Sequence, residues 1–212
     1  MASSPSFTTI LLVRHGATAT TGTVLPGRAA GLHLAEKGVA QAEGVARRIA
    51  ELGKKPVAVY VSPLERARET AAPIAQALKL RPVAERGLLE CDFGSWTGKK
   101  LDLLRRKPEW KTVLNAPSTF RFPEGESFAE MQLRMWSTLE KLARTHRNRT
   151  IVVVSHADTI KAAVTYAMGV PLDLFQRTVI STCSVSAIAF TNSTPVVLCV
   201  NNTGSLKELA PS

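Results

Sequence analysis

The chain reads LLVRHGAT from Leu11 to Thr18, and this stretch decides the fold. Its apolar first half predicts a buried strand, which ends at Arg14, His15 and Gly16. Side chains at the end of such a strand project into the crevice of an open α/β sheet. A guanidinium fork donates paired hydrogen bonds to phosphate oxygens, and an imidazole acts as base, acid or nucleophile near neutral pH. The stretch therefore predicts a phosphate site with a reactive histidine beside it.

The composition is that of an ordinary globular domain. The chain has 212 residues, of which 45% are apolar. No apolar run reaches the roughly 18 to 20 residues that span a bilayer, and the N-terminal sequence lacks the features of a secretory signal. The 3 cysteines form no C-x-x-C pair and argue against a disulfide scaffold. We therefore expect a single cytoplasmic domain, residues 1–212, with flexible tails at residues 1–7 and 204–212.

The chain is strongly basic, with a net charge of +10 and a pI near 10.0. Such a charge attracts nucleic acids, membrane surfaces and phosphorylated metabolites. The basic residues are spread along the chain, however, and aromatic residues make up only 6% of it, unlike a groove that stacks single-stranded nucleic acid. We expect a small phosphorylated substrate, no nucleic-acid partner and no membrane partner, and we leave a homo-oligomer open.

Strand-like and helix-like segments alternate along the chain. The segments that predict strands are Thr8–Val13, Val57–Val61, Thr150–Val154, Val185–Thr191 and Val196–Val200. Helical spacing predicts helices at Ala35–Leu52, Ser62–Lys79, Ser127–His146 and Thr159–Met168, with a short one near Lys99–Lys107. The second and third of these helices begin with capping-box sequences, SPLE and SFAE. This order predicts an α/β fold: a three-layer α/β/α sandwich with a mostly parallel central sheet and an antiparallel edge strand.

Polar side chains follow three of the predicted strands. Arg14 and His15 follow the first strand, Arg66 lies in the first turn of the helix after the second, and His156 follows the strand Thr150–Val154. The carboxyl ends of parallel strands share one edge of a sheet, so these side chains are expected to meet there. A helix start adds unpaired N–H groups that favour an anion. The sequence therefore predicts a pocket for a phosphoryl group, and it contains no P-loop motif.

Five motifs together resemble those of the histidine phosphatase superfamily, the phosphoglycerate-mutase-like enzymes. VRHGAT at residues 13–18 resembles the family's Arg-His-Gly-x-Thr signature, and SPLERARETA at residues 62–71 resembles its second motif. Three further stretches are similar to later family motifs: LECDFGSWTG at 89–98, PEGES at 123–127 and VSH at 154–156. The motifs come in family order over roughly residues 8 to 190. The resemblance implies a phosphoglycerate-mutase-like fold.

The resemblance also implies a role for each residue of the pocket. His15 would be the nucleophile that forms a phosphohistidine, and Glu90 would be the general acid and then the general base. Arg14, Arg66 and His156 would bind the oxygens of the transferring phosphoryl group. No cofactor is implied, and the spacing of the histidines predicts no metal site.

Two further candidates stand in the loop after the first strand. Many family members carry an asparagine six residues after the nucleophile, as a phosphate ligand. Thr21 occupies that position here, and its hydroxyl could still donate a hydrogen bond. Arg28 could reach the phosphate or the body of the substrate. Later in the chain, the residues after His156 are not glycines, and we expect Asp158 to be the N-cap of the next helix.

The sequence favours a phosphatase over a mutase. In the mutases of this family an arginine follows the general acid and a long insertion covers the site. Here Cys91 follows Glu90, and the stretch before Ser155 is short. We expect a phosphomonoesterase of the histidine acid phosphatase type, acting through a phosphohistidine on a small metabolite. The alternatives are mutase-type phosphoryl transfer and a catalytically silent regulatory or binding domain. The segment around Glu90 is similar to broad-specificity, α-ribazole-phosphate and sugar-bisphosphate phosphatases alike.

Overall fold

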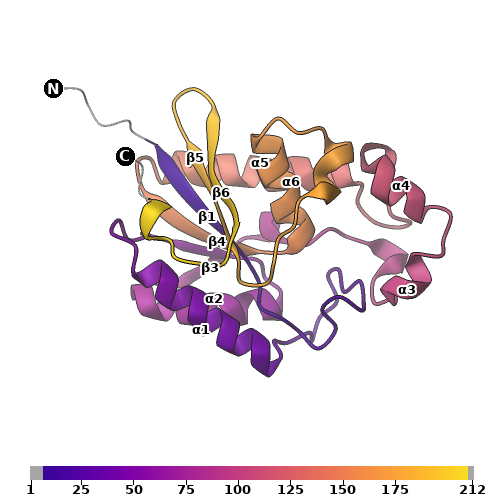
Figure 1. The fold of residues 1–212 in the computed structure, drawn as a ribbon, viewed down its shortest axis with the longest axis horizontal. Coiled ribbons are helices and arrows are strands. Elements are labelled where there is room, and N and C mark those ends of the chain that lie inside the picture. The colour runs from indigo at the N-terminus through magenta and orange to yellow at the C-terminus, as the bar shows by residue number, and fades with distance from the viewer. Residues whose placement is uncertain (1–6, 210–212) are drawn as a thin grey trace.

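The computed structural model describes residues 7–209, which build helices around one six-stranded sheet (Figure 1). The strands are β1 (Thr8–Arg14), β2 (Val59–Val61), β3 (Pro82–Ala84), β4 (Thr150–Ser155), β5 (Val185–Phe190) and β6 (Pro195–Asn202). Their order in the sheet is β3-β2-β4-β1-β5-β6. The first four in this order run parallel, whereas β5 and β6 are antiparallel to their neighbours. The predicted mostly parallel sheet with an antiparallel edge is confirmed.

Helices cover both faces of the sheet. The α-helices are α1 (Glu36–Ala50), α2 (Glu65–Leu78), α3 (Leu101–Leu104), α4 (Trp110–Asn115), α5 (Phe128–Thr145) and α6 (Ala157–Ala167). Short 3₁₀ helices lie at Arg86–Leu88, Gly94–Trp96, Pro117–Thr119, Leu172–Arg177 and Lys207–Leu209. The four long helices predicted from the sequence correspond to α1, α2, α5 and α6.

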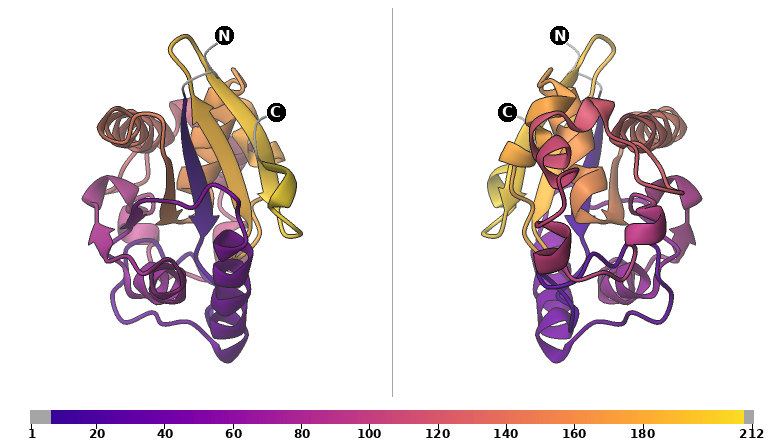
Figure 2. Two further views of the ribbon diagram at one scale, coloured as in Figure 1. Left: turned by 90° about the vertical axis from the view of Figure 1, so that its left-hand side faces the viewer. Right: turned by 90° about the vertical axis from the view of Figure 1, so that its right-hand side faces the viewer.

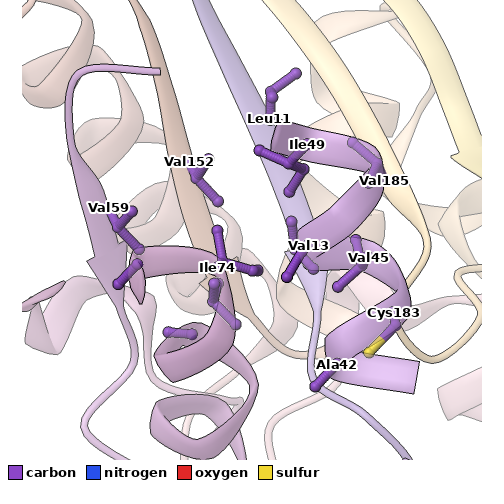
Figure 3. Close-up of a cluster of buried hydrophobic side chains, with 14 of the residues drawn as sticks. Leu11, Val13, Ala42, Val45, Ile49, Val59, Ile74, Val152, Cys183 and Val185 are labelled. Atoms are coloured by element: carbon purple, nitrogen blue, oxygen red, sulfur yellow. The ribbon is translucent and has the colours of Figure 1, made fainter. Parts of the chain in front are cut away.

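The alternation of side chains along β1 explains the three layers. Leu11 and Val13 face α1 and α2, where they pack with Ile49 and Ile74 (Figure 3). Ile10 and Leu12 face the other way and join the core under α5 and α6. Because successive strand residues point to opposite faces, a continuous apolar run is what a strand buried on both sides requires.

The β5–β6 hairpin extends at the edge of the sheet away from the predicted site. In both views of Figure 2 the turn of this hairpin (yellow) lies at one end of the molecule and α1 (purple) at the other. Thr8, at the start of β1, pairs with Phe190, at the end of β5. The turn that follows Phe190 therefore lies beside the amino-terminal end of β1, opposite Arg14.

The segment between Leu88 and Ser127 contains more structure than predicted. Its aromatic side chains form a separate buried cluster that includes Phe93, Trp96 and Phe122. This cluster supports α3 and α4, whereas the sequence predicted only one short helix here. The local sequence, which is rich in Gly and Pro, gives little helical signal for these elements. Their stability comes from contacts between aromatic residues distant in the chain.

Two predictions of helix starts are wrong. Helix α2 begins at Glu65 with Leu64 as N-cap, and no side chain caps it, so the box predicted at Ser62 does not form. Helix α6 has His156 as N-cap, so Asp158 lies inside the first turn. The capping box at Ser127, by contrast, is complete: the Ser127 side chain accepts from the Glu130 amide, and the Glu130 side chain accepts from the Ser127 amide.

The predicted tails are only partly covered by the structure. Residues 1–6 and 210–212 lie outside the described part. Leu206 is buried in the core and Lys207–Leu209 forms a 3₁₀ helix, and the flexibility of the two tails stays a prediction. Over residues 7–209, no helix has the length and apolar character to cross a membrane. The same residues hold no group of three or more His, Cys, Asp or Glu side chains placed to bind a metal ion.

Candidate active site

The strand ends meet as the sequence predicted. Arg14 pairs with Ser155 across β1 and β4, and the His15 amide donates to the Ser155 carbonyl oxygen at 3.0 Å. The rings of His15 and His156 are edge-to-face with centroids 5.2 Å apart. Beside them lies a cavity of about 400 Å³, whose lining includes Arg14, His15 and Glu90. Its size is that of a small-molecule site.

His15 is held as one neutral tautomer. Its Nδ1 lies 2.8 Å from the carbonyl oxygen of Gly16, which only accepts, so Nδ1 carries the proton. Nε2 is therefore unprotonated, and it accepts from Nε of Arg66 at 3.3 Å. Burial and, next, the charge of Arg66 lower the pKa of His15 to about 3. The imidazole is neutral at physiological pH, and its unprotonated Nε2 faces Arg66.

Gly16 is fixed in turn by its surroundings. A Cβ at Gly16 would lie 2.5 Å from the carbonyl oxygen of Gly38, so the turn after β1 packs directly on the backbone of α1. The Gly16 amide donates to Thr70 Oγ1 at 3.0 Å, and that hydroxyl donates to the Arg66 carbonyl oxygen at 2.7 Å. The glycine of the opening motif thus holds the carbonyl that orients His15.

Three side chains around His15 have buried polar atoms without a partner among the described residues. These atoms are Nη1 of Arg66, Nε of Arg14 and Nδ1 of His156. The remaining bonds of these residues orient them: Arg66 Nη2 donates to Gly27 O at 2.7 Å, and Arg14 Nη1 to Ile180 O at 2.6 Å. Buried polar groups normally have partners, so the three atoms are suited to a bound anion.

His156 is oriented by a residue that the sequence assigned elsewhere. Its Nε2 lies 2.7 Å from Ser62 Oγ, and Ser62 stands two residues before Leu64, the N-cap of α2. Burial, followed by the nearby His15 and Arg66, lowers the pKa of His156 well below its usual value. The ring is therefore neutral and can present an N–H at Nδ1 when Nε2 accepts from Ser62.

The surroundings of Glu90 favour its protonated form, unlike those of an ordinary surface carboxylate. Its side chain is 7% exposed, and one carboxyl oxygen accepts from the Cys91 amide at 3.0 Å. Burial, and next the negative charge of Asp158, raises the pKa of Glu90 to about 7. Glu90 can therefore hold a proton near neutral pH and can also give it up.

Arg28 does not reach the cavity, contrary to its prediction as a phosphate or substrate ligand. Its Nε donates to the carbonyl oxygen of Glu90 at 2.9 Å, and its two terminal nitrogens bind Asp92 at 3.2 Å and Glu126 at 2.9 Å. Two acidic residues distant in the chain attract the guanidinium away from the phosphate end. Arg28 instead holds the backbone of Glu90.

A second arginine, which the sequence did not single out, also holds the backbone at Glu90. Arg134, on α5, donates to the carbonyl oxygens of Leu89 at 2.8 Å and Glu90 at 3.3 Å. Glu126 joins the two arginines, since its Oε1 accepts from Arg134 Nε at 2.8 Å and lies 2.9 Å from Arg28 Nη2. No local pattern marks Arg134. Glu126 lies in the PEGES motif, which was the available signal.

Thr21 lies at the cavity, as its position in the motif suggested. Its hydroxyl oxygen accepts from the Thr18 amide at 2.8 Å and lies 3.0 Å from the Thr18 hydroxyl. Thr21 therefore orders the loop after β1 and places a hydroxyl group on the cavity wall.

Comparisons with known proteins agree with this geometry. The sequence profile of the histidine phosphatase superfamily (branch 1) matches residues 10–203. Phosphoserine phosphatase 1 of Hydrogenobacter thermophilus is 33% identical over 178 residues, covering 82% of this chain and 83% of that protein. An Erwinia tasmaniensis protein named "Probable phosphoglycerate mutase GpmB" is 32% identical over 181 residues, covering 84% and 83%. A phosphoserine phosphatase mutant from Entamoeba histolytica, solved with phosphoserine, superposes with a TM-score of 0.84 at 27% identity, over 94% of this chain and 99% of that one. The chain therefore belongs to the histidine phosphatase superfamily.

Proposed function

We propose that this protein is a phosphomonoester hydrolase that acts on a small phosphorylated metabolite through a phosphohistidine. The observation that carries the proposal is the orientation of His15, whose Nδ1 is bonded to Gly16 O and whose Nε2 is left with a lone pair. Family membership and the likeness to proteins named phosphoserine phosphatase support it.

The phosphoryl group would bind between His15 and the unpaired donors. Arg14, Arg66 and His156 would donate to its oxygens, and the Thr21 hydroxyl would lie nearby. His15 Nε2 would attack phosphorus in line with the ester oxygen, so that an N–P bond forms as the O–P bond breaks. Two guanidinium groups would stabilise the charge on the transferring group.

Glu90 would supply and recover the proton. In the first step its carboxyl would protonate the leaving alkoxide, which departs as an alcohol. In the second step the carboxylate would take a proton from water, whose oxygen attacks phosphorus and breaks the N–P bond. Inorganic phosphate leaves, and His15 and Glu90 return to their starting protonation states.

We also propose that the chain is a single catalytic domain in a reducing cytoplasm. One sheet spans the described residues, and the family match covers residues 10–203. All three cysteines, Cys91, Cys183 and Cys199, are free thiols, as expected in a reducing compartment.

Hydrolysis of p-nitrophenyl phosphate by the wild type and by His15→Ala tests the proposal. We expect the wild type to release phosphate and the variant to lose this activity. A labelled phosphoryl group should be trapped on the wild type as an acid-labile, alkali-stable adduct. Activity that survives in His15→Ala would exclude the nucleophile assignment. Faster isomerisation of 3-phosphoglycerate than release of phosphate would show a mutase instead.

A further inference from the structure

The cavity continues beyond the phosphate end, and its outer wall is apolar. Leu101 and Trp110, from α3 and α4, line it together with Leu25 from the loop after β1. Figure 1 shows α3 and α4 together at one end of the molecule, away from the β5–β6 hairpin. The Trp110 ring is stacked on Trp96 with centroids 6.2 Å apart, and Trp96 is buried in the aromatic cluster. The wall therefore has a fixed shape.

Two aliphatic side chains at this part of the cavity are open to solvent. Leu114, on α4, is 46% exposed, and Val179, in the segment before β5, is 66% exposed. Exposed apolar side chains that gather in a cavity, rather than singly on a surface, are typical of a site that a ligand covers. Covering them with an apolar group would remove both from water.

The charged side chains of the outer cavity are largely paired with each other. Lys161 Nζ lies 3.3 Å from Asp158 and donates to Gln176 at 3.0 Å. Arg105, which is exposed, has no ion-pair partner within residues 7–209. An amino-acid head group carries both an ammonium and a carboxylate, and each needs an opposite charge. Among residues 7–209, the outer cavity offers one cation without an ion-pair partner, and its Asp158 carboxylate is ion-paired with Lys161.

We propose that the preferred substrate is a phosphomonoester of a predominantly apolar alcohol, whose aromatic or branched aliphatic body lies against Leu114, Val179 and Trp110. This inference rests on the proposed hydrolase function and specifies the substrate class of the same site. O-phosphoserine would then be a poorer substrate, because its zwitterionic body would leave the apolar wall uncovered.

The test compares two primary alkyl esters, 2-phenylethyl phosphate and O-phosphoserine, so that aromatic leaving groups do not bias the chemical step. We expect kcat/KM to be at least about tenfold higher for the phenylethyl ester, given the apolar area that it buries. Leu114→Asn should lower kcat/KM for 2-phenylethyl phosphate more than for methyl phosphate, which is too short to reach α4. The matched control is Leu133→Asn, at a leucine on α5 that is 68% exposed and outside the cavity lining. The Leu133→Asn variant should have the wild-type kcat/KM for 2-phenylethyl phosphate and for methyl phosphate.

Equal or higher kcat/KM for O-phosphoserine would overturn the inference and leave the hydrolase proposal intact. If neither ester nor p-nitrophenyl phosphate is hydrolysed, the proposed function fails, and calorimetric binding of the two esters to His15→Ala then decides the inference separately. Tighter binding of 2-phenylethyl phosphate than of O-phosphoserine supports the apolar site. Equal binding of the two esters, or the same loss in Leu133→Asn as in Leu114→Asn, contradicts it.

Discussion

Nε of Arg66 lies 3.3 Å from Nε2 of His15, so the guanidinium faces the ring nitrogen that carries the lone pair. The Arg66 side chain is fully buried at this position. Its charge, added to the effect of burial, opposes protonation of His15 and lowers the pKa of the imidazole to about 3. Burial and this contact together keep the proposed nucleophile neutral, and the contact places a proposed phosphate ligand beside it.

Replacing Arg66 by lysine should lower kcat/KM by about 100-fold or more, because a lysine cannot reproduce the planar fork that contacts both His15 and a phosphate oxygen. Steady-state kinetics with p-nitrophenyl phosphate measures the loss, and circular dichroism checks the fold. Arg68→Lys, two residues further along the same helix at an exposed position, is the control and should change neither. Equal losses in both variants would contradict the assigned role of Arg66.

The pH dependence of activity should follow Glu90 and His15. Since the pKa of Glu90 is raised to about 7, kcat/KM should fall as the pH rises through that value and the acid loses its proton. On the acid side, activity should persist until the pH approaches about 3, where His15 becomes protonated. A pH–rate profile measures both limbs. Glu90→Gln should remove the alkaline limb at a lower overall rate, and an unchanged limb would show that another group is responsible.

Glu90 should also make the fold less stable at alkaline pH. A carboxyl group whose pKa is raised in the folded state binds its proton more tightly there than in the unfolded chain. Its stabilising contribution is present below the unfolded pKa and is lost as the pH rises towards about 7. Denaturant unfolding of the wild type and Glu90→Gln should therefore diverge over this range, with the variant more stable at the higher pH. Parallel stability curves would contradict the raised pKa.

The Glu126 carboxylate should act as a positioning residue through the two arginines that hold the Glu90 backbone. Glu126→Gln removes the charge that binds Arg28 and Arg134, so the proposed acid should be held less accurately. We expect kcat to fall roughly tenfold with a smaller change in KM, and the alkaline limb of the pH profile to move. Glu124→Gln, an exposed neighbour, is the control. A loss of stability with an unchanged pH profile would indicate a purely structural role.

Two buried serines provide a matched pair for testing the orientation of His156. Ser62→Ala removes the hydroxyl 2.7 Å from His156 Nε2 and should cost about 1 kcal/mol of unfolding free energy as well as activity. Ser184→Ala removes a buried hydroxyl that has no partner within residues 7–209, and should be neutral or stabilising with full activity. Thermal unfolding and kinetics of both variants measure the difference. Equal changes in stability and activity in the two variants would contradict a role of Ser62 in orienting His156.

Local spacing predicted much of this protein correctly, and its errors share a cause. All five predicted strands are present, because a buried strand is marked by its own apolar run. The capping box at Ser127 forms, whereas the one at Ser62 does not: α2 begins only after Leu64, and the Ser62 hydroxyl contacts His156 at a distant strand end. Arg28 was assigned to phosphate for the same reason: its acidic partners lie far along the chain.

The sequence by itself determined the α/β order and supplied the candidate groups for holding and attacking a phosphate, because apolar periodicity and motif residues are local properties. Only the tertiary structure decided the protonation of Glu90, the tautomer of His15, the task of Arg28 and the apolar outer wall of the cavity. These properties depend on burial and on charges contributed by residues far apart in the chain. Folding brings such residues within a few ångströms, and that proximity sets the chemistry of the site.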